Sequence, residues 1–276
     1  MNERSLREAL RGLPVPDIRY FDVIGSTNDH ALAWAANGAR DGSLVVADVQ
    51  TAGRGRSGRR WITIPGGGLA FSLIILPTAK EQQYFSFFSP LGALGISQAL
   101  IEGYQLPAMI KYPNDILLNR RKTAGILVEA SWLGDKPQCV IIGIGLNVAP
   151  ISVPPQEQLL FPATCIETVL GQPVDRWQLL AKIIRGITYW RARLDSAEFV
   201  QTWHDRLAFK GEMVTVQPDH QKPALYGKII GIDQNGSLLL QSKNGIQTII
   251  IGDVLLRPLE GNSSATLGGL NGEEKP

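Results

Sequence analysis

The sequence predicts an α+β fold, with a mixed, mostly antiparallel sheet and flanking helices, followed by a small C-terminal β-barrel. Three observations lead to this class. Apolar runs of strand length between residues 108 and 148 are separated by short polar turns, which is typical of strands joined as hairpins. Segments with helical spacing lie elsewhere, most clearly at 174–194. After residue 210, short β runs alternate with Asn-Gly pairs, the strongest short-range hairpin signal.

The first part of the chain alternates strands and helices. Residues 18–25 predict a strand, and a helix follows with Ser26 as its N-cap and Gly38 at its end. Apolar runs at 43–50 and 66–76 predict two strands on either side of a loop rich in arginine and glycine. The segment 84–104 predicts a buried helix that begins around Ser89, because Pro90 is tolerated only near a helix start.

The second part contains the hairpins. Residues 108–132 predict a short strand, a Pro-Asn-Asp corner, a second strand, a polar turn at 119–121 and a longer strand, and 139–148 adds one more strand. After a proline-rich loop at 150–163, helices are predicted over 174–194 and about 196–208. We expect a first domain over 1–209, a β-barrel domain over 210–260 and a disordered tail over 261–276.

Composition and charge are those of a soluble globular protein. Hydrophobic residues make up 44% of the chain and charged residues 19%, which argues against extensive disorder. The net charge is +2 and would be −2 without the four arginines of residues 51–61, so positive charge is concentrated locally. Neither a secretory signal nor a run of eighteen apolar residues occurs. Because Cys139 and Cys165 are expected as buried free thiols, we predict a cytoplasmic protein without a membrane partner.

The strongest local signal is the stretch "TAGRGRSGRRW" at 51–61, called the arginine–glycine loop below. Glycine lets backbone amides approach a ligand, and the planar fork of donors on arginine suits phosphate or carboxylate. We therefore interpret this loop as an anion clamp. Two other interpretations stay open here, a solvated basic loop without a ligand and a nucleic-acid-binding tract. A dinucleotide fingerprint and a P-loop are both excluded by the sequence context.

A second polar cluster lies in "KYPNDILLNRRKTAGILVE" at 111–129. Asn114 and Asp115 place an amide and a carboxylate at a turn, and Lys122 then enters an apolar strand, where its charge needs an anionic partner or an exposed end. Taken singly, the first two also fit plain turn chemistry, and Lys122 also fits a strand end in water. The histidines are scattered, and the sequence contains no zinc-ligand spacing and no G-x-S-x-G elbow.

Five motifs in a fixed order narrow the interpretation. They are "STN" at 26–28, "Q" at 50 followed by "TAGRGRSGRRW", "KYPND" at 111–115, "RKTAGILVE" at 121–129 and "GIGLNV" at 143–148. Together they closely resemble the motif series of biotin-protein ligases, over roughly residues 18–260. The resemblance implies a catalytic domain over 1–209 like class II aminoacyl-tRNA synthetases and biotin synthetases, with an SH3-like barrel over 210–260.

Such enzymes are ATP-dependent ligases. The resemblance implies that biotin and ATP are substrates, that Mg²⁺ is required and that biotinyl-5′-AMP forms. The biotinyl group would then pass to a lysine of the biotin carboxyl carrier protein of acetyl-CoA carboxylase. Some bacterial members carry an N-terminal helix-turn-helix repressor domain, but only about twenty residues precede the first predicted strand here, so we expect a monofunctional ligase that does not bind DNA. Dimers are frequent in the family, which makes a homodimer a further candidate.

The resemblance also assigns roles to residues at the motif positions. The candidates for catalysis are Lys122, which would hold the biotin carboxylate or an α-phosphate oxygen, and Arg56, which would close over the adenylate. The candidates for biotin binding are Ser26, Thr27, Asn28, Gln50, Gly53, Arg54, Gly55, Arg56, Lys122 and Gly125. The candidates for ATP binding are Arg56, Arg59, Trp61, Asn114, Asp115, Lys122 and Asn147, the last as an adenine contact. No residue is assigned as a metal ligand.

Two departures from the family pattern and two alternative functions accompany this interpretation. Ser57 stands where arginine is common, and Tyr112 stands where the family motif usually has tryptophan; both are neighbours of the inferred contacts. A lipoate ligase or octanoyl transferase would share the fold, but the arginine–glycine loop and the C-terminal barrel favour biotin. A nucleic-acid-binding module is the alternative of a different class, and the near-neutral net charge speaks against it.

Overall fold

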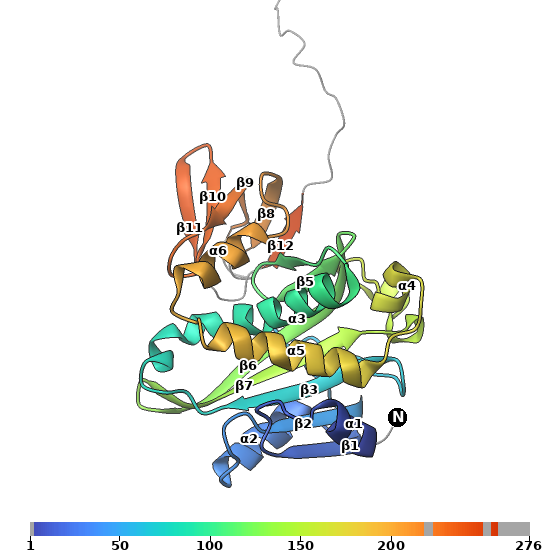
Figure 1. Ribbon diagram of the computed structural model, residues 1–276. Helices are drawn as coiled ribbons and strands as arrows, with labels where there is room; N and C mark the ends of the chain where they lie inside the picture. The colour runs from blue at the N-terminus through green and yellow to red at the C-terminus, as the bar shows by residue number, and fades with distance from the viewer. Residues whose placement is uncertain (1–2, 218–222, 251–254, 259–276) are drawn as a thin grey trace, which may run out of the picture.

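The computed structural model describes residues 3–217, 223–250 and 255–258. Its larger sheet has seven strands in the order β1-β2-β3-β7-β6-β5-β4 (Figure 1). β1 (Ile18–Ile24) and β2 (Leu44–Gln50) are parallel, and the other neighbouring strands are antiparallel, so the predicted mixed, mostly antiparallel sheet is confirmed. The remaining strands are β3 (Gly68–Ile75), β4 (Met109–Lys111), β5 (Asp115–Leu118), β6 (Arg121–Leu133) and β7 (Lys136–Asn147).

Side-chain alternation along the strands divides the core between the two faces of this sheet. Leu44 and Val46 of β2 pack in one cluster with α3 (Phe88–Tyr104) and α5 (Arg176–Arg191). Val45, between them, packs on the opposite face with α2 (Thr27–Ala36). Figure 1 shows α3 and α5 side by side over the first face. The sheet is therefore covered by helices on both faces, with the helix pair on one of them.

The predicted helices are confirmed, with small shifts at their ends. α3 begins one residue before Ser89 and carries Pro90 in its first turn, where proline costs least. It continues from a 3₁₀ segment, and the helical stretch Glu81–Tyr104 is long and apolar enough to cross a membrane by length and composition. That stretch is a core helix here, because 67% of its most apolar window is buried.

Several short helical segments were not predicted. They are α1 (Glu3–Ala9), α4 (Ile166–Leu170) and the 3₁₀ turns Glu81–Phe87, Pro150–Ser152 and Gln156–Gln158. α1 is only two turns long and packs on α5 through Leu6, so its stability depends on a tertiary contact that local periodicity does not show. α6 (Ala197–Asp205) lies within the helix predicted over about 196–208. Cys139 and Cys165 are buried free thiols, as expected.

A second sheet follows α6 and is entirely antiparallel, in the order β11-β10-β9-β8-β12. Its strands are β8 (Met213–Gln217), β9 (Leu225–Ile232), β10 (Leu238–Ser242), β11 (Gly245–Ile249) and β12 (Leu255–Pro258). The predicted Asn-Gly turns are confirmed, and Gly236 and Gly245 adopt φ angles of +79° and +101°. The disordered tail predicted at 261–276 lies outside the described residues.

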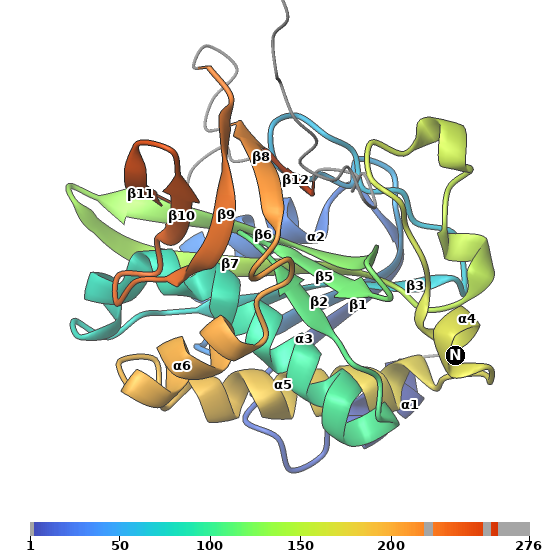
Figure 2. The same cartoon turned by 90° about the horizontal axis from the view of Figure 1, so that it is seen from above.

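The small sheet contacts the corner between β4 and β5. The hydroxyl of Tyr112 donates to the backbone oxygen of Ile249 at 3.1 Å, and its ring stacks on Trp203 of α6 with centroids 6.1 Å apart. Figure 2 shows the small sheet above the β5 and β6 side of the large sheet. The C-terminal sheet thus lies next to the 111–115 motif.

Candidate active site

One cavity of about 410 Å³ lies where these elements meet. Its walls come from the first turn of α2, the arginine–glycine loop, the β4–β5 corner, β6, β7 and the segment after β7, and the C-terminal sheet adds Gln217 and Arg257. Seven arginine or lysine residues line the cavity, and Asp115 is the one acidic residue among the described lining residues. Such an excess of positive charge in a concave site favours an anionic ligand.

Fourteen of the fifteen residues selected from the sequence line this cavity. They are Ser26, Thr27, Asn28, Gln50, Arg54, Gly55, Arg56, Arg59, Trp61, Asn114, Asp115, Lys122, Gly125 and Asn147. Gly53 is the exception. It is buried, and a Cβ atom there would overlap the backbone oxygen of Trp61. Gly53 therefore shapes the loop from behind the cavity wall.

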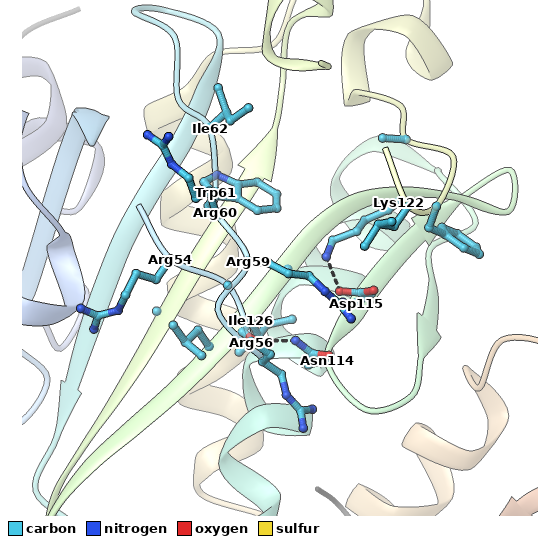
Figure 3. Close-up of a pocket in the computed structure, with 18 of the residues that line it drawn as sticks. Arg54, Arg56, Arg59, Arg60, Trp61, Ile62, Asn114, Asp115, Lys122 and Ile126 are labelled. Atoms are coloured by element: carbon cyan, nitrogen blue, oxygen red, sulfur yellow. Dashed lines mark hydrogen bonds and ion pairs between the residues drawn. The ribbon is translucent and has the colours of Figure 1, made fainter. Parts of the chain in front are cut away.

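The arginine–glycine loop folds as a short hairpin along the cavity (Figure 3). The backbone N–H of Trp61 donates to the oxygen of Gly53 at 2.9 Å, and that of Gly55 donates to the oxygen of Arg59 at 2.7 Å. At the tip, Ser57 has a φ angle of +54°, in the left-handed region. The loop that the sequence predicts as a clamp therefore has a defined, hydrogen-bonded arrangement beside the cavity.

The indole of Trp61 rests on the sheet because two strands carry glycine at adjacent positions. Gly125 of β6 and Gly145 of β7 are paired in register. A Cβ atom on Gly145 would overlap the indole, and one on Gly125 would lie 3.2 Å from Nζ of Lys122. The Lys122 ammonium is 5.7 Å from the centre of the Trp61 ring, within the range of a cation–π contact. Lys122 and Trp61 therefore occupy the space over Gly125, one of the candidates for biotin binding.

A cluster of hydrogen-bonded polar side chains forms another part of the wall. Gln50 Oε1 accepts hydrogen bonds from the backbone N–H and hydroxyl of Thr27, at 2.8 and 3.0 Å. Because its oxygen is held in this way, Gln50 can offer its Nε2 hydrogens to a ligand. Asn28 Oδ1 accepts from the hydroxyl of Ser72 at 2.6 Å. Sequence reasoning missed Ser72, because it is a single polar residue within an apolar strand.

Two lysines share the carboxylate of Asp115. Lys122 Nζ lies 2.6 Å from Oδ1 and Lys111 Nζ lies 3.2 Å from Oδ2. Figure 3 marks the pair between Lys122 and Asp115 with a dashed line. Burial raises the pKa of Asp115, but the charges of Lys122 and Lys111 outweigh burial and lower this pKa to about 2. Burial lowers the pKa of Lys111, which is 5% exposed. Asp115 is therefore a fixed anion that orients two ammonium groups at the cavity.

This arrangement predicts a pH-dependent contribution to stability. The Asp115→Asn variant leaves Lys111 buried without its counter-ion, so we expect a loss of about 3–5 kcal/mol in the free energy of unfolding at pH 7. The pKa of Asp115 is depressed in the folded state, so its contribution is present above the ordinary value of 3.8 and is lost as the pH falls toward about 2. Urea denaturation should therefore show a smaller difference between the two proteins at pH 3 than at pH 7.

A matched control for this prediction is the exposed pair between Arg120 and Glu212. Its side chains are 61% and 41% exposed, so Glu212→Gln should change the free energy of unfolding by less than about 1 kcal/mol. An equally small effect of Asp115→Asn at pH 7 would contradict the account of the buried lysines.

Two asparagines on the cavity wall are anchored through their amide nitrogens. Asn114 Nδ2 donates to the backbone oxygen of Ile126 at 2.8 Å, and Asn147 Nδ2 donates to that of Thr164 at 3.2 Å. Asn114 follows the cis peptide bond between Tyr112 and Pro113. Both side chains keep their Oδ1 acceptors, which suits recognition of donors on a ligand.

Arg54 differs from the other arginines of the loop. Figure 3 shows its side chain directed away from the pair formed by Lys122 and Asp115. The guanidinium forms ion pairs with Glu129 of β6 at 2.8 Å and with Asp29 of α2 at 2.5 Å. Although burial lowers the pKa of Arg54, its bonds to these carboxylates raise it overall. The side chain thus fastens the loop to α2 and β6.

Arg257 of β12 is a cavity residue that sequence reasoning missed. Burial and the charge of Arg59 lower its pKa, while Asp115 raises it. Its guanidinium lies 5.5 Å from the ring centre of Phe161, which comes from the segment predicted only as a proline-rich loop. No local signal marks a single arginine in a β run, because its position at the cavity depends on how the two sheets pack.

The side chains of this site are suited to holding reactants in place and stabilising their negative charge. Fixed cations and amide donors stabilise charge that develops on phosphoryl oxygens, and this needs no proton transfer. Among the described residues, no group of three His, Cys, Asp or Glu side chains could hold a metal ion, and both oxygens of Asp115 are paired with lysines. A Mg²⁺ ion would therefore have to enter largely on the phosphates of a nucleotide, as Mg²⁺ commonly does.

Comparison with known proteins agrees with these features. Residues 20–147 match the Biotin/lipoate A/B protein ligase family, and residues 210–257 match the biotin protein ligase C-terminal domain. The bifunctional ligase/repressor BirA of Bacillus subtilis is 35% identical over 243 residues, which cover 86% of this chain and 73% of that protein. The biotin–[acetyl-CoA-carboxylase] ligase of Paracoccus denitrificans is 34% identical over 235 residues, covering 83% and 96% respectively.

A solved structure shares both sheets. The biotin protein ligase from Aquifex aeolicus, in complex with biotin and ATP, matches with a TM-score of 0.77 at 29% identity. The match covers 88% of this chain and 100% of that one. The similarity therefore extends over both sheets of this chain.

Proposed function

The chain belongs to the biotin protein ligase family, and on that premise we propose that its cavity binds biotin and ATP side by side and joins them as biotinyl-5′-AMP. The activity is that of a biotin–[acetyl-CoA-carboxylase] ligase, which attaches biotin to a carrier protein through this adenylate. One observation carries the proposal for this cavity: polar side chains of fixed hydrogen-bonding direction and a cluster of cations line the same 410 Å³ space.

The polar cluster suits the ureido ring of biotin. A ureido group has one carbonyl acceptor and two N–H donors. Gln50 is held through its oxygen and so offers N–H donors, while Thr27 and Ser26 carry hydroxyl groups that both donate and accept. These residues would contact the ring, and the apolar chain of biotin would then extend toward Trp61 and Lys122.

The cation cluster suits the adenylation step. In this step a carboxylate oxygen of biotin attacks the α-phosphorus of ATP, a new O–P bond forms, and the bond to the β-phosphate breaks to release pyrophosphate. The two reactants repel each other because both are anionic. Lys122 would neutralise the carboxylate and an α-phosphate oxygen, while Arg56, Arg59 and Arg257 would contact phosphate groups. Asn147 and Trp61 would contact the nucleoside.

Positioning would supply much of the acceleration. Holding two reactants in contact can contribute roughly 7–11 kcal/mol. ATP would enter as its magnesium complex, with the ion carried by the phosphates. In the second step, the ε-amine of the carrier lysine attacks the acyl carbon of the adenylate, and AMP leaves. The arginine–glycine loop would shield the adenylate from water until the carrier arrives.

The proposal also divides the protein into two domains. Residues 1–209 would form the catalytic domain, and 210–260 would form a domain that completes the cavity through Gln217 and Arg257. We place the enzyme in the cytoplasm, where the buried thiols of Cys139 and Cys165 would stay reduced. A homodimer stays a prediction, which light scattering on the purified protein can check.

A modification assay tests the function. The protein is mixed with biotin, MgATP and a carrier domain of acetyl-CoA carboxylase, and the carrier is analysed by intact mass and peptide mapping. We expect one biotinyl group on one lysine, with no reaction when ATP is left out. Lipoate should replace biotin poorly in the same assay. Preferential transfer of lipoate would instead support the lipoate ligase alternative.

A further inference from the structure

We propose that Glu129 and Ser72 are positioning residues that link the arginine–glycine loop to the biotin side of the cavity. Neither residue lines the cavity, and neither belongs to the set selected from the sequence. The proposal rests on the function above, because it concerns how the same cavity holds biotin and its adenylate. It depends on a continuous chain of hydrogen bonds through Arg54, Glu129, Asn28 and Ser72.

The chain of hydrogen bonds begins at the arginine–glycine loop. Both side-chain oxygens of Glu129 lie 2.8 Å from Nη2 of Arg54, and Nη1 of Arg54 lies 2.5 Å from Asp29. Arg54 follows Gly53 and precedes Gly55, so its side chain anchors the hairpin near its base. Glu129 belongs to β6 in the middle of the sheet, paired opposite Ile141 of β7. The loop is thereby tied to an interior strand of the large sheet.

The chain continues from Glu129 to Asn28. Glu129 Oε2 also accepts from Nδ2 of Asn28, at 2.7 Å. An ionised carboxylate only accepts hydrogen bonds, so it requires Asn28 to turn its amide nitrogen toward β6. The backbone oxygen of Leu127 accepts from the same nitrogen at 3.3 Å. Glu129 is therefore the closer of two acceptors, and the charged one, that turn the amide nitrogen of Asn28 toward β6.

Ser72 fixes the opposite end of that amide. Its hydroxyl donates to Oδ1 of Asn28 at 2.6 Å and lies 2.8 Å from the hydroxyl of Thr27. Ser72 is completely buried, so the cost of burying its hydroxyl is offset only by these bonds. The hydroxyl of Thr27 donates to Gln50, so the hydrogen-bond chain that ends at Ser72 lies directly beside the polar cluster.

The sheet is shaped to receive Asn28. Ser72, Gly143 and Leu127 form one register row across β3, β7 and β6. A Cβ atom on Gly143, the middle residue of this row, would overlap the side chain of Asn28. Asn28 therefore rests on the glycine, with its amide held by the row's outer residues. Such close contact indicates that the orientation of Asn28 is defined by the sheet and not by a ligand alone.

The ion pairs themselves contribute little to folding. The side chains of Arg54, Asp29 and Glu129 are 40%, 53% and 29% exposed, and exposed pairs are weak because solvent screens them. A merely structural role would predict small stability effects and nothing else. A positioning role predicts a loss of biotin affinity and faster escape of the adenylate, in proteins that remain folded.

The test measures adenylate retention in a double-mutant cycle. Enzyme-bound biotinyl-5′-AMP is formed from labelled biotin and MgATP, the free reactants are removed, and the half-life of the bound adenylate is measured. Arg54→Ala and Glu129→Gln should each shorten this half-life by about five- to tenfold. The double variant should show no further decrease, because both changes break the same connection. Additive effects, or unchanged half-lives, would overturn the proposal.

The KM for biotin is a second readout, and it distinguishes the loop end of the hydrogen-bond chain from its Asn28 end. Glu129→Gln should raise the KM for biotin more than Arg54→Ala does, because a glutamine amide no longer dictates the orientation of Asn28. Ser72→Ala should also raise this KM, with kcat changed less. Equal KM values for all variants and the wild type would contradict the link to Asn28. Urea denaturation confirms in each case that the variant is folded.

The matched control is again the pair between Arg120 and Glu212, which is also joined by two hydrogen bonds, at 2.7 and 2.9 Å, but lies outside the cavity lining. Arg120→Ala and Glu212→Gln should leave the half-life of the adenylate unchanged. The two levels of the proposal can also be told apart. If the wild-type protein forms no adenylate, the proposed function fails; if it forms adenylate and the Arg54→Ala and Glu129→Gln variants retain it normally, only the present inference fails.

Discussion

Replacing Lys122 with alanine is expected to lower the rate of biotinyl-5′-AMP formation by at least about 100-fold, the usual effect of removing a single group that stabilises transition-state charge. Lys122 Nζ is fixed between Oδ1 of Asp115 and the face of Trp61, so the cation is held in place before substrates bind. Without it, the biotin carboxylate would approach the triphosphate with no cation placed to neutralise both reacting groups. Biotin-dependent release of pyrophosphate measures this step directly.

The Lys122→Ala variant should remain folded. Asp115 keeps its second partner, Lys111, so the buried carboxylate does not lose all compensation. The matched control is Lys136→Ala, at the exposed start of β7, which should release pyrophosphate at the wild-type rate. Near-normal pyrophosphate release by a folded Lys122→Ala protein would remove this lysine from the proposed mechanism.

Replacing Arg56 with glycine is expected to release the adenylate into solution. Arg56 is half-buried at the tip of the arginine–glycine loop and lines the cavity. The substitution removes a cation and a side chain, and it leaves glycine at three of the four positions 55–58, which increases the conformational freedom of the loop. We therefore expect the half-life of the bound adenylate to fall by about tenfold or more.

The escaped adenylate gives a second readout. Because it is a reactive acyl phosphate anhydride, it should biotinylate lysines of an added bystander protein such as serum albumin. Arg11→Gly, at an exposed arginine before β1, is the matched control and should leave bystander labelling at the wild-type level. Normal retention of the adenylate by Arg56→Gly, with no bystander labelling, would contradict the role of the loop.

The fold was predictable where local signals are strong. Apolar runs of strand length identified each strand of the large sheet, and Asn-Gly pairs located turns of the small one. α1 and α4 were missed because each is a short segment with one fully buried side chain, Leu6 or Ile166, so its stability comes from tertiary contacts. The local sequence pattern also does not show that β1 and β2 pair in parallel, although the prediction of a mixed sheet was correct.

The residues of the site also fall into those that the sequence identified and those that it did not. Residues in the ordered motifs were found because the resemblance places them, and fourteen of them do meet at one cavity. Ser72 and Arg257 were missed because each is a single polar residue in a strand. Glu129 lies within the 121–129 motif but was not selected, because nothing in the sequence shows its partners. Their importance appears only when the chain is folded: Glu129 meets an arginine 75 positions away and an asparagine 101 positions away. Such long-range pairs carry no local signature.

A structure of this chain with bound biotin would show whether the cavity is the ligase site. The ureido ring should lie beside Thr27 and Gln50, the carboxylate should lie within hydrogen-bonding distance of Lys122, and the arginine–glycine loop should cover the ligand. Biotin bound outside this cavity, or bound within it without any contact from the loop or from Lys122, would contradict the account.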